Sequence, residues 1–201
     1  MEASHVLEPS NNALIFLHLR VVIGIVVGLS ITRLLSGLAR FIQHPRSSRV
    51  FPTHLGWALI LLLMVVHFWW WEFRLSDISH WSFHLYFFVV FYAVLFFLLC
   101  ALLFPDSTDD YSGYESYFFS RRRWFFGILA LNFSTDMIDT LVKDRAHFEA
   151  LGLEYPIRNG TLVLLCLIAM SVRNRLFHAA FMIGTFFYQL SWVIRDLDPI
   201  G

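Results

Sequence analysis

The feature that most constrains this chain is residues 81–104, a run of 24 residues without Asp, Glu, Lys or Arg. Its sequence is WSFHLYFFVVFYAVLFFLLCALLF. An α-helix rises 1.5 Å per residue, so about 20 apolar residues span the roughly 30 Å of hydrocarbon in a bilayer. A soluble core helix is rarely so long and so apolar on every side. We therefore expect an integral membrane protein.

The composition of the whole chain agrees with a bilayer environment. Hydrophobic residues make up 58% of the 201 residues and charged residues only 15%, whereas soluble domains carry roughly 25% charged residues. We predict an all-α polytopic membrane protein, a bundle of about six transmembrane helices that forms a single domain over residues 1–201. The expected spans are residues 13–42, 55–74, 81–104, 124–142, 159–173 and 176–194.

The distribution of basic residues predicts the orientation of these spans. Loops 40–54, 105–123 and 173–175 carry eight Arg residues on one side of the bundle, and the opposite side carries five Lys and Arg residues with many acidic ones. By the positive-inside rule these three loops are cytoplasmic and both termini lie outside. The fifth expected span, 159–173, is the shortest, and a re-entrant segment there would move the C-terminus to the other side.

Charge, cysteine content and motifs argue against several classes of protein. The formal net charge is zero, which argues against a nucleic-acid partner. Cys100 and Cys166 both fall inside apolar segments, so neither a disulfide framework nor a cysteine-rich zinc site is expected. The patterns HExxH, GxSxG, CxxC and GxGxxG do not occur in the sequence, so no catalytic motif indicates an enzyme.

The fourth expected span holds the most informative polar residues. Four of them are spaced by four, three and four positions and therefore share one helix face: Asn132, Asp136, Asp139 and Lys143. A carboxylate at this depth avoids lipid, so Asp136 is expected to face a partner or a water-filled cavity. Two interpretations stay open, a structural pair with Arg20 or Lys143 and a functional proton or cation site.

Polar residues also gather at one depth, in the outer half of the bundle. They come from four different spans and comprise His18, Arg20, His67, His84, Asp136 and Asp139. The inner half holds fewer, namely Arg33, His54 and His178. Because polar groups in lipid are costly, the shared depth predicts a polar cluster that opens outward. Depth alone does not establish that the side chains meet.

Small residues recur every four positions along the first expected span. They are Gly24, Gly28, Thr32 and Ser36. Such a ridge lets another helix approach closely. The approaching helix is expected to belong either to the same chain or to a second copy of it.

Four functions are compatible with the predicted cluster, and we favour transport of an ion, a proton or a small solute. The alternative is a non-catalytic accessory or scaffold subunit of a membrane complex. Further alternatives are a metal-dependent membrane enzyme, with His18, His67, His84 and an Asp as ligands, and a b-type haem protein in which His178 pairs with His54, and His84 or His18 with His67. The expected partners are the lipid bilayer and either a second copy of the chain or a membrane partner subunit. The sequence identifies no cofactor.

Overall fold

The computed structural model describes residues 11–43, 50–78, 81–105, 110–143 and 145–197, and every regular element in these ranges is helical. The long helices are α1 (Asn11–Gln43), α2 (Pro52–Trp71), α3 (Phe83–Leu103), α4 (Tyr114–Lys143), α6 (Glu154–Ser171) and α7 (Arg175–Leu197). A 3-10 helix, η1 (Glu72–Asp77), continues α2, and a short helix, α5 (Arg145–Ala150), follows α4.

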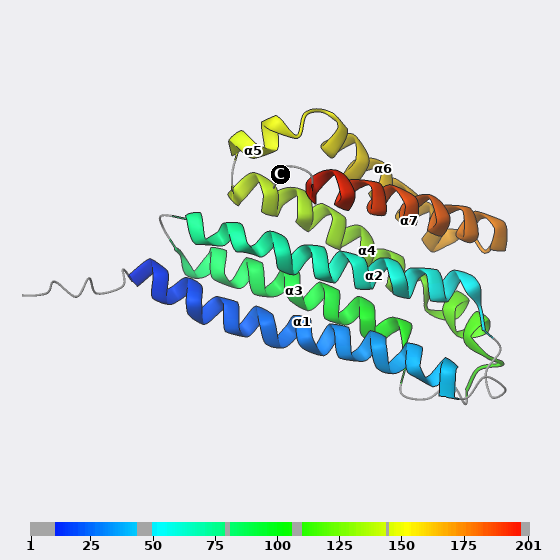
Figure 1. Ribbon diagram of the computed structural model, residues 1–201. Coiled ribbons are helices and arrows are strands. Elements are labelled where there is room, and N and C mark those ends of the chain that lie inside the picture. Colours follow the sequence, from blue (N-terminus) through cyan, green and yellow to red (C-terminus); the bar gives the residue numbers. More distant parts are fainter. Residues whose placement is uncertain (1–10, 44–49, 79–80, 106–109, 144, 198–201) are drawn as a thin grey trace, which may run out of the picture.

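The long helices lie side by side as a bundle (Figure 1). Helix α1 packs against α3 and α2, α3 packs against α4, α4 packs against α6, and α2 packs against α7. Figure 1 places the start of α1, the end of α2 and α5 at one end of the bundle, which we call the α5 end. The turn between α6 and α7 lies at the opposite end.

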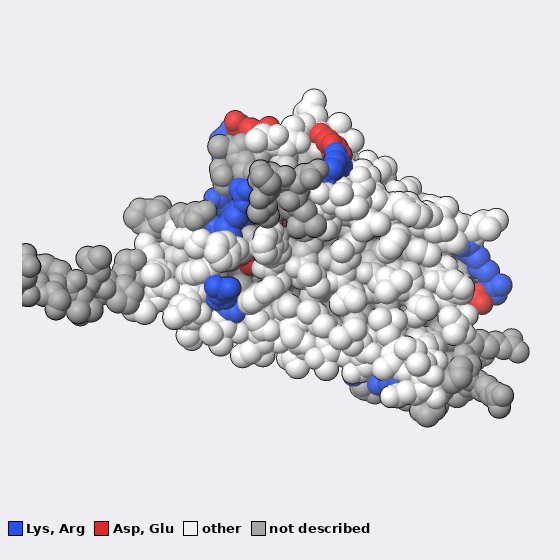
Figure 2. Space-filling model, viewed as in Figure 1, with Lys and Arg blue, Asp and Glu red and all other residues white. Residues whose placement is uncertain are grey.

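Five helices are long and apolar enough to cross a membrane: α1, α2 with η1, α3, α4 and α7. Helix α6 falls outside this group because its first half carries Glu154, Arg158 and Asn159. On the face shown in Figure 2, charged side chains gather toward the two ends and leave a broad uncharged band between them. These features are compatible with an integral membrane protein.

Several helix bounds differ from those expected. Helix α4 begins at Tyr114 rather than at 124, because Tyr114, Tyr117 and Phe118 are buried in the bundle and extend the helix backward from the arginines. Helix α6 begins at Glu154 rather than at 159, and neither η1 nor α5 was expected. Arg46 and Arg49, which contribute to the predicted charge bias, lie outside the described residues.

The core is aromatic at the end opposite α5. Near the start of α2, the fully buried Trp57 lies edge-on to three phenylalanine rings, with centroid distances of 5.6 Å to Phe125, 5.5 Å to Phe126 and 5.2 Å to Phe181. These rings join α2, α4 and α7 into a tightly packed layer. Asn132, Asp136 and Asp139 of α4 lie on the α5 side of this layer.

The predicted small-residue ridge lies mostly on the exposed side of α1. A Cβ added at Gly24 would lie 3.3 Å from the Trp69 ring, whereas one added at Gly28 would meet nothing within 4 Å. Thr32 and Ser36 are exposed. Within this chain the close approach to α1 occurs instead at Gly37, where an added Cβ would collide with the Phe104 ring.

Candidate functional site

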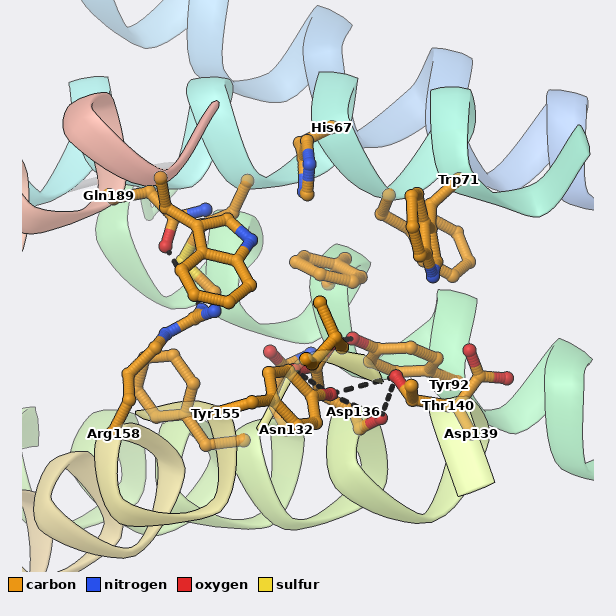
Figure 3. A pocket seen from close by; sticks show the side chains of 16 residues that line it. His67, Trp71, Tyr92, Asn132, Asp136, Asp139, Thr140, Tyr155, Arg158 and Gln189 are labelled. Carbon is orange, nitrogen blue, oxygen red and sulfur yellow. Dashed lines mark hydrogen bonds between the residues drawn. The ribbon is translucent and has the colours of Figure 1, made fainter. Parts of the chain in front are cut away.

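A cavity of about 50 Å³ lies near the α5 end, enclosed by α2, α3, α4, α6 and α7. Three of the residues predicted to form the polar cluster line it: His67 from α2, and Asp136 and Asp139 from α4. Figure 3 shows His67 pointing from α2 toward the α4 side chains across this space. The His67 ring also stacks on Trp71, with 6.2 Å between their centroids.

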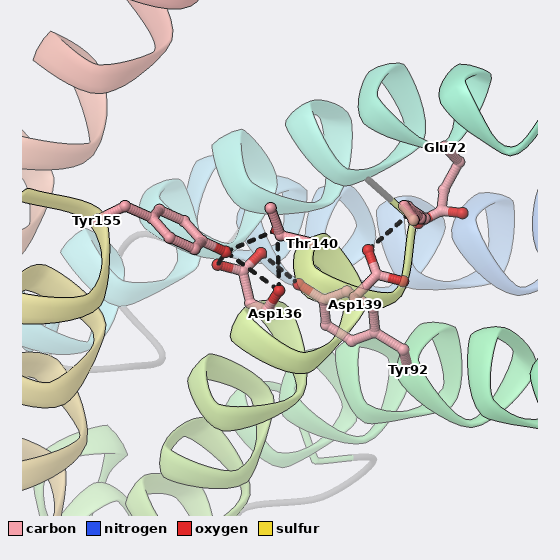
Figure 4. Close-up of polar contacts among 7 residues, drawn as sticks. Glu72, Tyr92, Asp136, Asp139, Thr140 and Tyr155 are labelled. Carbon is pink, nitrogen blue, oxygen red and sulfur yellow. Dashed lines mark hydrogen bonds and ion pairs between the residues drawn. The ribbon is translucent and has the colours of Figure 1, made fainter. Parts of the chain in front are cut away.

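The carboxylate of Asp136 accepts three hydrogen bonds from side chains around the cavity. Its Oδ1 accepts a hydrogen bond of 2.9 Å from the Tyr92 hydroxyl on α3. Its Oδ2 accepts one of 2.9 Å from the Tyr155 hydroxyl and one of 3.2 Å from the Asn159 amide, both on α6 (Figure 4). All three donors are neutral. In the part of the chain that the structure describes, no cation forms an ion pair with Asp136, so its negative charge is solvated but not neutralised.

Asn132 lies one turn before Asp136 and lines the same cavity. Its side chain is fully buried, and neither its amide nitrogen nor its amide oxygen has a hydrogen-bond partner among the described residues. One oxygen of Asp139 is likewise buried without a partner. A buried polar group without partners costs about 1–3 kcal/mol, so the cavity concentrates hydrogen-bonding capacity that the fold does not use.

Next to the cavity, three charged groups form a buried network between η1 and α4. The Lys143 ammonium lies 2.7 Å from Glu72 and 2.6 Å from Asp139, and these side chains are at most 5% exposed. Lys143, one of the two cations considered as a partner of Asp136, therefore pairs with Asp139 and Glu72 instead. The network ties the end of α2 to the end of α4 (Figure 4).

Arg158 supplies the remaining charge at the cavity. Its guanidinium donates to the Gln189 side chain at 3.2 Å and lies 4.7 Å from the centroid of the Trp192 ring. When the three carboxylates of Asp136, Asp139 and Glu72 are ionised, Lys143 and Arg158 balance only two of them. In that ionised state the site would carry one uncompensated negative charge in a region of low dielectric constant, a situation that favours a cation or a proton.

An exposed ion pair joins α6 and α7 beside the cavity. Arg195 contacts Glu154 through two hydrogen bonds of 2.7 and 3.1 Å, and the Tyr188 hydroxyl donates a third of 2.7 Å. The Arg195 hydrogen bonds and that from Tyr188 lower the pKa of Glu154 to about 2. Glu154 therefore stays ionised over the physiological pH range.

The other three residues of the predicted cluster do not reach the cavity. His18 and His84 are exposed, and His18 packs on Tyr86 with 6.2 Å between ring centroids. Arg20 is exposed and lies over the rings of Trp69 and Phe73, at 6.0 and 5.8 Å. Among the described residues it forms no ion pair. All three lie at the α5 end, as expected from depth, but point to other faces.

The residues considered for haem or metal binding are also separated. His54 Nε2 lies 2.6 Å from the Leu103 carbonyl, and His178 Nε2 lies 2.9 Å from the Val172 carbonyl. Each ring is buried and already bonded to backbone, so iron ligation through Nε2 would require those hydrogen bonds to break. No group of three or more His, Cys, Asp or Glu side chains in the described ranges is arranged to hold a metal ion.

Three residues of the site were not among the predicted ones: Tyr92 and Tyr155, which donate to Asp136, and Glu72, which pairs with Lys143. Comparison with known proteins finds no matching family model, no similar curated protein and no similar solved structure. The site is therefore interpreted from its own chemistry.

Proposed function

We propose that the protein is a small multi-pass membrane transport protein whose cavity at Asp136 binds a proton or a small monovalent cation. The observation that carries the proposal is the buried Asn132 amide, which has no partner and lines the same cavity as Asp136. Together with the unpaired oxygen of Asp139, it offers oxygen ligands around a net negative charge. Oxygen ligands are those preferred by hard cations.

The size of the cavity favours a small ligand over a larger solute. A water molecule needs about 10–15 Å³ of such space, so the cavity of about 50 Å³ has room for a few waters or one partly hydrated ion. An organic solute would need a wider conformation. We therefore narrow the transported species to a proton or a small inorganic cation.

Translocation requires a second conformation, because packed aromatic residues lie beyond the cavity. Phe96 and Phe133 line the cavity and are at most 2% exposed, and the Trp57 layer follows toward the other end. The backbones of α6 and α7 lie close together at few points, although side chains join the two helices at the α5 end, and the helices pack against α4 and α2 respectively. A relative movement of these two helices would open the inner side while Asp136 stays on α4.

The proposal includes six spans, with α6 as the sixth, and both termini outside. Loops 40–54, 105–123 and 173–175 are then cytoplasmic, as their arginines favour. Fusions of a reporter to the two termini, assayed in intact and in permeabilised cells, test this topology. Termini on opposite sides would contradict it.

Ion flux into proteoliposomes tests the transport function. Purified protein is reconstituted, and uptake of protons, Na⁺ and K⁺ is recorded under an imposed membrane potential. Flux of at least one ion should exceed that of empty liposomes. It should fall about tenfold or more in Asp136→Asn, because the variant loses the negative charge that binds the ion.

Asp110→Asn is the matched control, since Asp110 is exposed at the opposite end of the bundle. This variant should transport at the wild-type rate. Equal flux in wild type and Asp136→Asn, or no flux from either, would contradict the proposal.

The buried network of Glu72, Lys143 and Asp139 favours a second candidate, an accessory or scaffold subunit. Its two ion pairs hold η1 and α4 together, which is a structural role. In that case the exposed ridge around Gly28 would face a partner helix, either from a second copy or from another subunit. Purification in mild detergent would then recover a stoichiometric partner or a homo-oligomer that Gly28→Leu disrupts.

A further inference from the structure

A second and larger cavity, of about 420 Å³, lies between α6 and α7. All of its lining residues belong to these two helices, so it is a groove open to the surroundings of the bundle. It forms because α6 packs against α4 while α7 packs against α2, which leaves the two helices apart although residues 172–174 connect them. Its volume lies in the range of about 300–1,000 Å³ typical of small-molecule sites.

The lining of the groove changes character along its length. At the α5 end it is charged, with Arg158 on α6. Thr185 on α7 comes next, and then the apolar side chains of Leu162, Leu165 and Phe181. Gln189, which holds the Arg158 guanidinium, lies four residues after Thr185, so the hydroxyl and the charge are about one helical turn apart.

Arg158 has hydrogen-bonding capacity to spare. Its Nε is buried and has no acceptor, and no carboxylate of the described residues lies within ion-pair distance of its guanidinium. Aromatic rings hold it in place, Trp192 at 4.7 Å and Tyr188 at 5.8 Å. Glu154 at the same rim is neutralised by Arg195, so it does not oppose an anion bound at Arg158.

Thr185 also lacks a partner, unlike three threonines of α4 and α6. Thr135, Thr140 and Thr161 each donate to the carbonyl four residues earlier, at 2.7–3.1 Å. Thr185 is only 4% exposed, and its hydroxyl makes no hydrogen bond within the described part of the chain. A buried hydroxyl that lines the groove is thus available to a ligand.

We propose that this groove binds one glycerophospholipid. Its phosphate contacts Arg158, an ester group accepts a hydrogen bond from Thr185, and one acyl chain lies against Leu162, Leu165 and Phe181. The order of charged, polar and apolar side chains along the groove matches the order of phosphate, ester and chain in such a lipid. The groove shares Arg158 with the Asp136 cavity, but lipid binding there requires no transported ion, only a bundle in contact with lipid.

Native mass spectrometry of the full chain in detergent tests the proposal. The protein is titrated with phosphatidylglycerol and, in parallel, with diacylglycerol of the same chains and with inorganic phosphate. A single phosphatidylglycerol should stay bound at detergent concentrations that remove other lipids. Diacylglycerol should bind about tenfold more weakly, because it lacks the charge-assisted contact, and inorganic phosphate should not displace the lipid.

Two glycine variants distinguish this groove from general lipid contact. Gly184 lines the groove and Gly160 does not, and a Cβ added at either meets nothing within 4 Å. Gly184→Leu should weaken lipid binding about tenfold or more by filling the groove, whereas Gly160→Leu should bind as the wild type does. Arg158→Gln should weaken binding about tenfold, and the nearly isosteric Thr185→Val about threefold.

Equal lipid affinity in Gly184→Leu and Gly160→Leu would overturn the proposal. So would equal affinity for diacylglycerol and phosphatidylglycerol, or complete displacement of the lipid by inorganic phosphate. Circular dichroism of each variant shows whether the helices are intact. If Gly184→Leu does not fold, the comparison of Thr185→Val with wild type decides, and unchanged affinity there contradicts the assignment.

Discussion

The hydroxyl of Tyr155 on α6 donates a hydrogen bond of 2.9 Å to Oδ2 of Asp136 on α4. It also lies 2.8 Å from the hydroxyl of Thr140. Because Tyr92 of α3 bonds the other carboxylate oxygen, Asp136 joins three helices at one point. A movement of α6 must break these contacts, so the bond couples the position of α6 to the state of the carboxylate.

Loss of the hydrogen bond between Tyr155 and Asp136 should destabilise the fold. The effect of replacing Tyr155 should depend on whether Asp136 is present. Tyr155→Phe is expected to lower the free energy of unfolding by about 1 kcal/mol, the size of a typical hydrogen bond inside a helical membrane protein. Unfolding of Tyr155→Phe, Asp136→Asn and the double variant in detergent measures this. Strictly additive effects would show that the two side chains do not interact.

The Lys143 ammonium should be essential for the buried network at η1. Lys143→Met leaves the carboxylates of Glu72 and Asp139 buried without a cation and should cost about 3–5 kcal/mol. Neutralising all three, as Glu72→Gln, Lys143→Met and Asp139→Asn together, should restore most of the stability. Arg145→Met, at an exposed residue of α5, is the control and should change little. A triple variant no more stable than Lys143→Met alone would contradict this account.

The ion pair between Glu154 and Arg195 should make a pH-dependent contribution to stability. The pKa of Glu154 falls from 4.5 to about 2 on folding, so its contribution is fully present above about pH 4.5 and is lost as the pH falls toward 2. The melting temperature of wild type should exceed that of Glu154→Gln by a constant amount at neutral pH. The difference should shrink below pH 4.5, and a difference independent of pH down to 2 would refute this prediction.

Close packing of α1 should depend on Gly37 and not on Gly28. Gly37→Ala places a methyl group into the Phe104 ring and should destabilise the protein by about 1–3 kcal/mol. Gly28→Ala meets nothing within 4 Å and should be neutral or stabilise by up to about 1 kcal/mol, since alanine favours helix. Thermal unfolding of the purified protein in detergent compares the two. If Gly28→Ala were the more damaging variant, a contact with another copy would be indicated.

The polar face of α4 was predictable from spacing, because residues three and four apart share a helix face whatever surrounds it. The structure places Asn132, Asp136 and Asp139 on one cavity accordingly. The pairing of Lys143 with Glu72 was not predictable, since Glu72 lies in a 3-10 helix whose geometry depends on how α2 ends.

Convergence of the histidines was not predictable from depth. Depth follows from position along a helix, but the direction of a side chain depends on how the helix is rotated in the bundle. His67 faces inward, while His18 and His84 are exposed. The run 81–104 does form a wall of the cavity, through Tyr92 and Phe96 rather than through His84.

The two tyrosines that hold Asp136 carried a weak signal in the sequence. Tyr92 lies near the middle of an apolar run, where its hydroxyl needs a partner, and that requirement points to a nearby acceptor. Tyr155 falls before the expected fifth span, where the sequence predicts a loop. It belongs to α6 because that helix begins at Glu154.

The variant Asn132→Leu should lose ion transport without losing thermal stability, so it distinguishes a role in function from a role in folding. Asn132→Leu is close in shape and removes two buried polar atoms that have no partner in the described structure. The melting temperature should therefore match or exceed that of wild type. A clear loss of stability would mean that the amide has a structural role.

The most direct test of a binding cavity at Asp136 is the initial rate of ion uptake by Asn132→Leu in proteoliposomes, at protein incorporation equal to wild type. We expect a rate lower by about tenfold or more in a protein that is at least as stable, because the ion loses a ligand of the cavity. Uptake at the wild-type rate would contradict it.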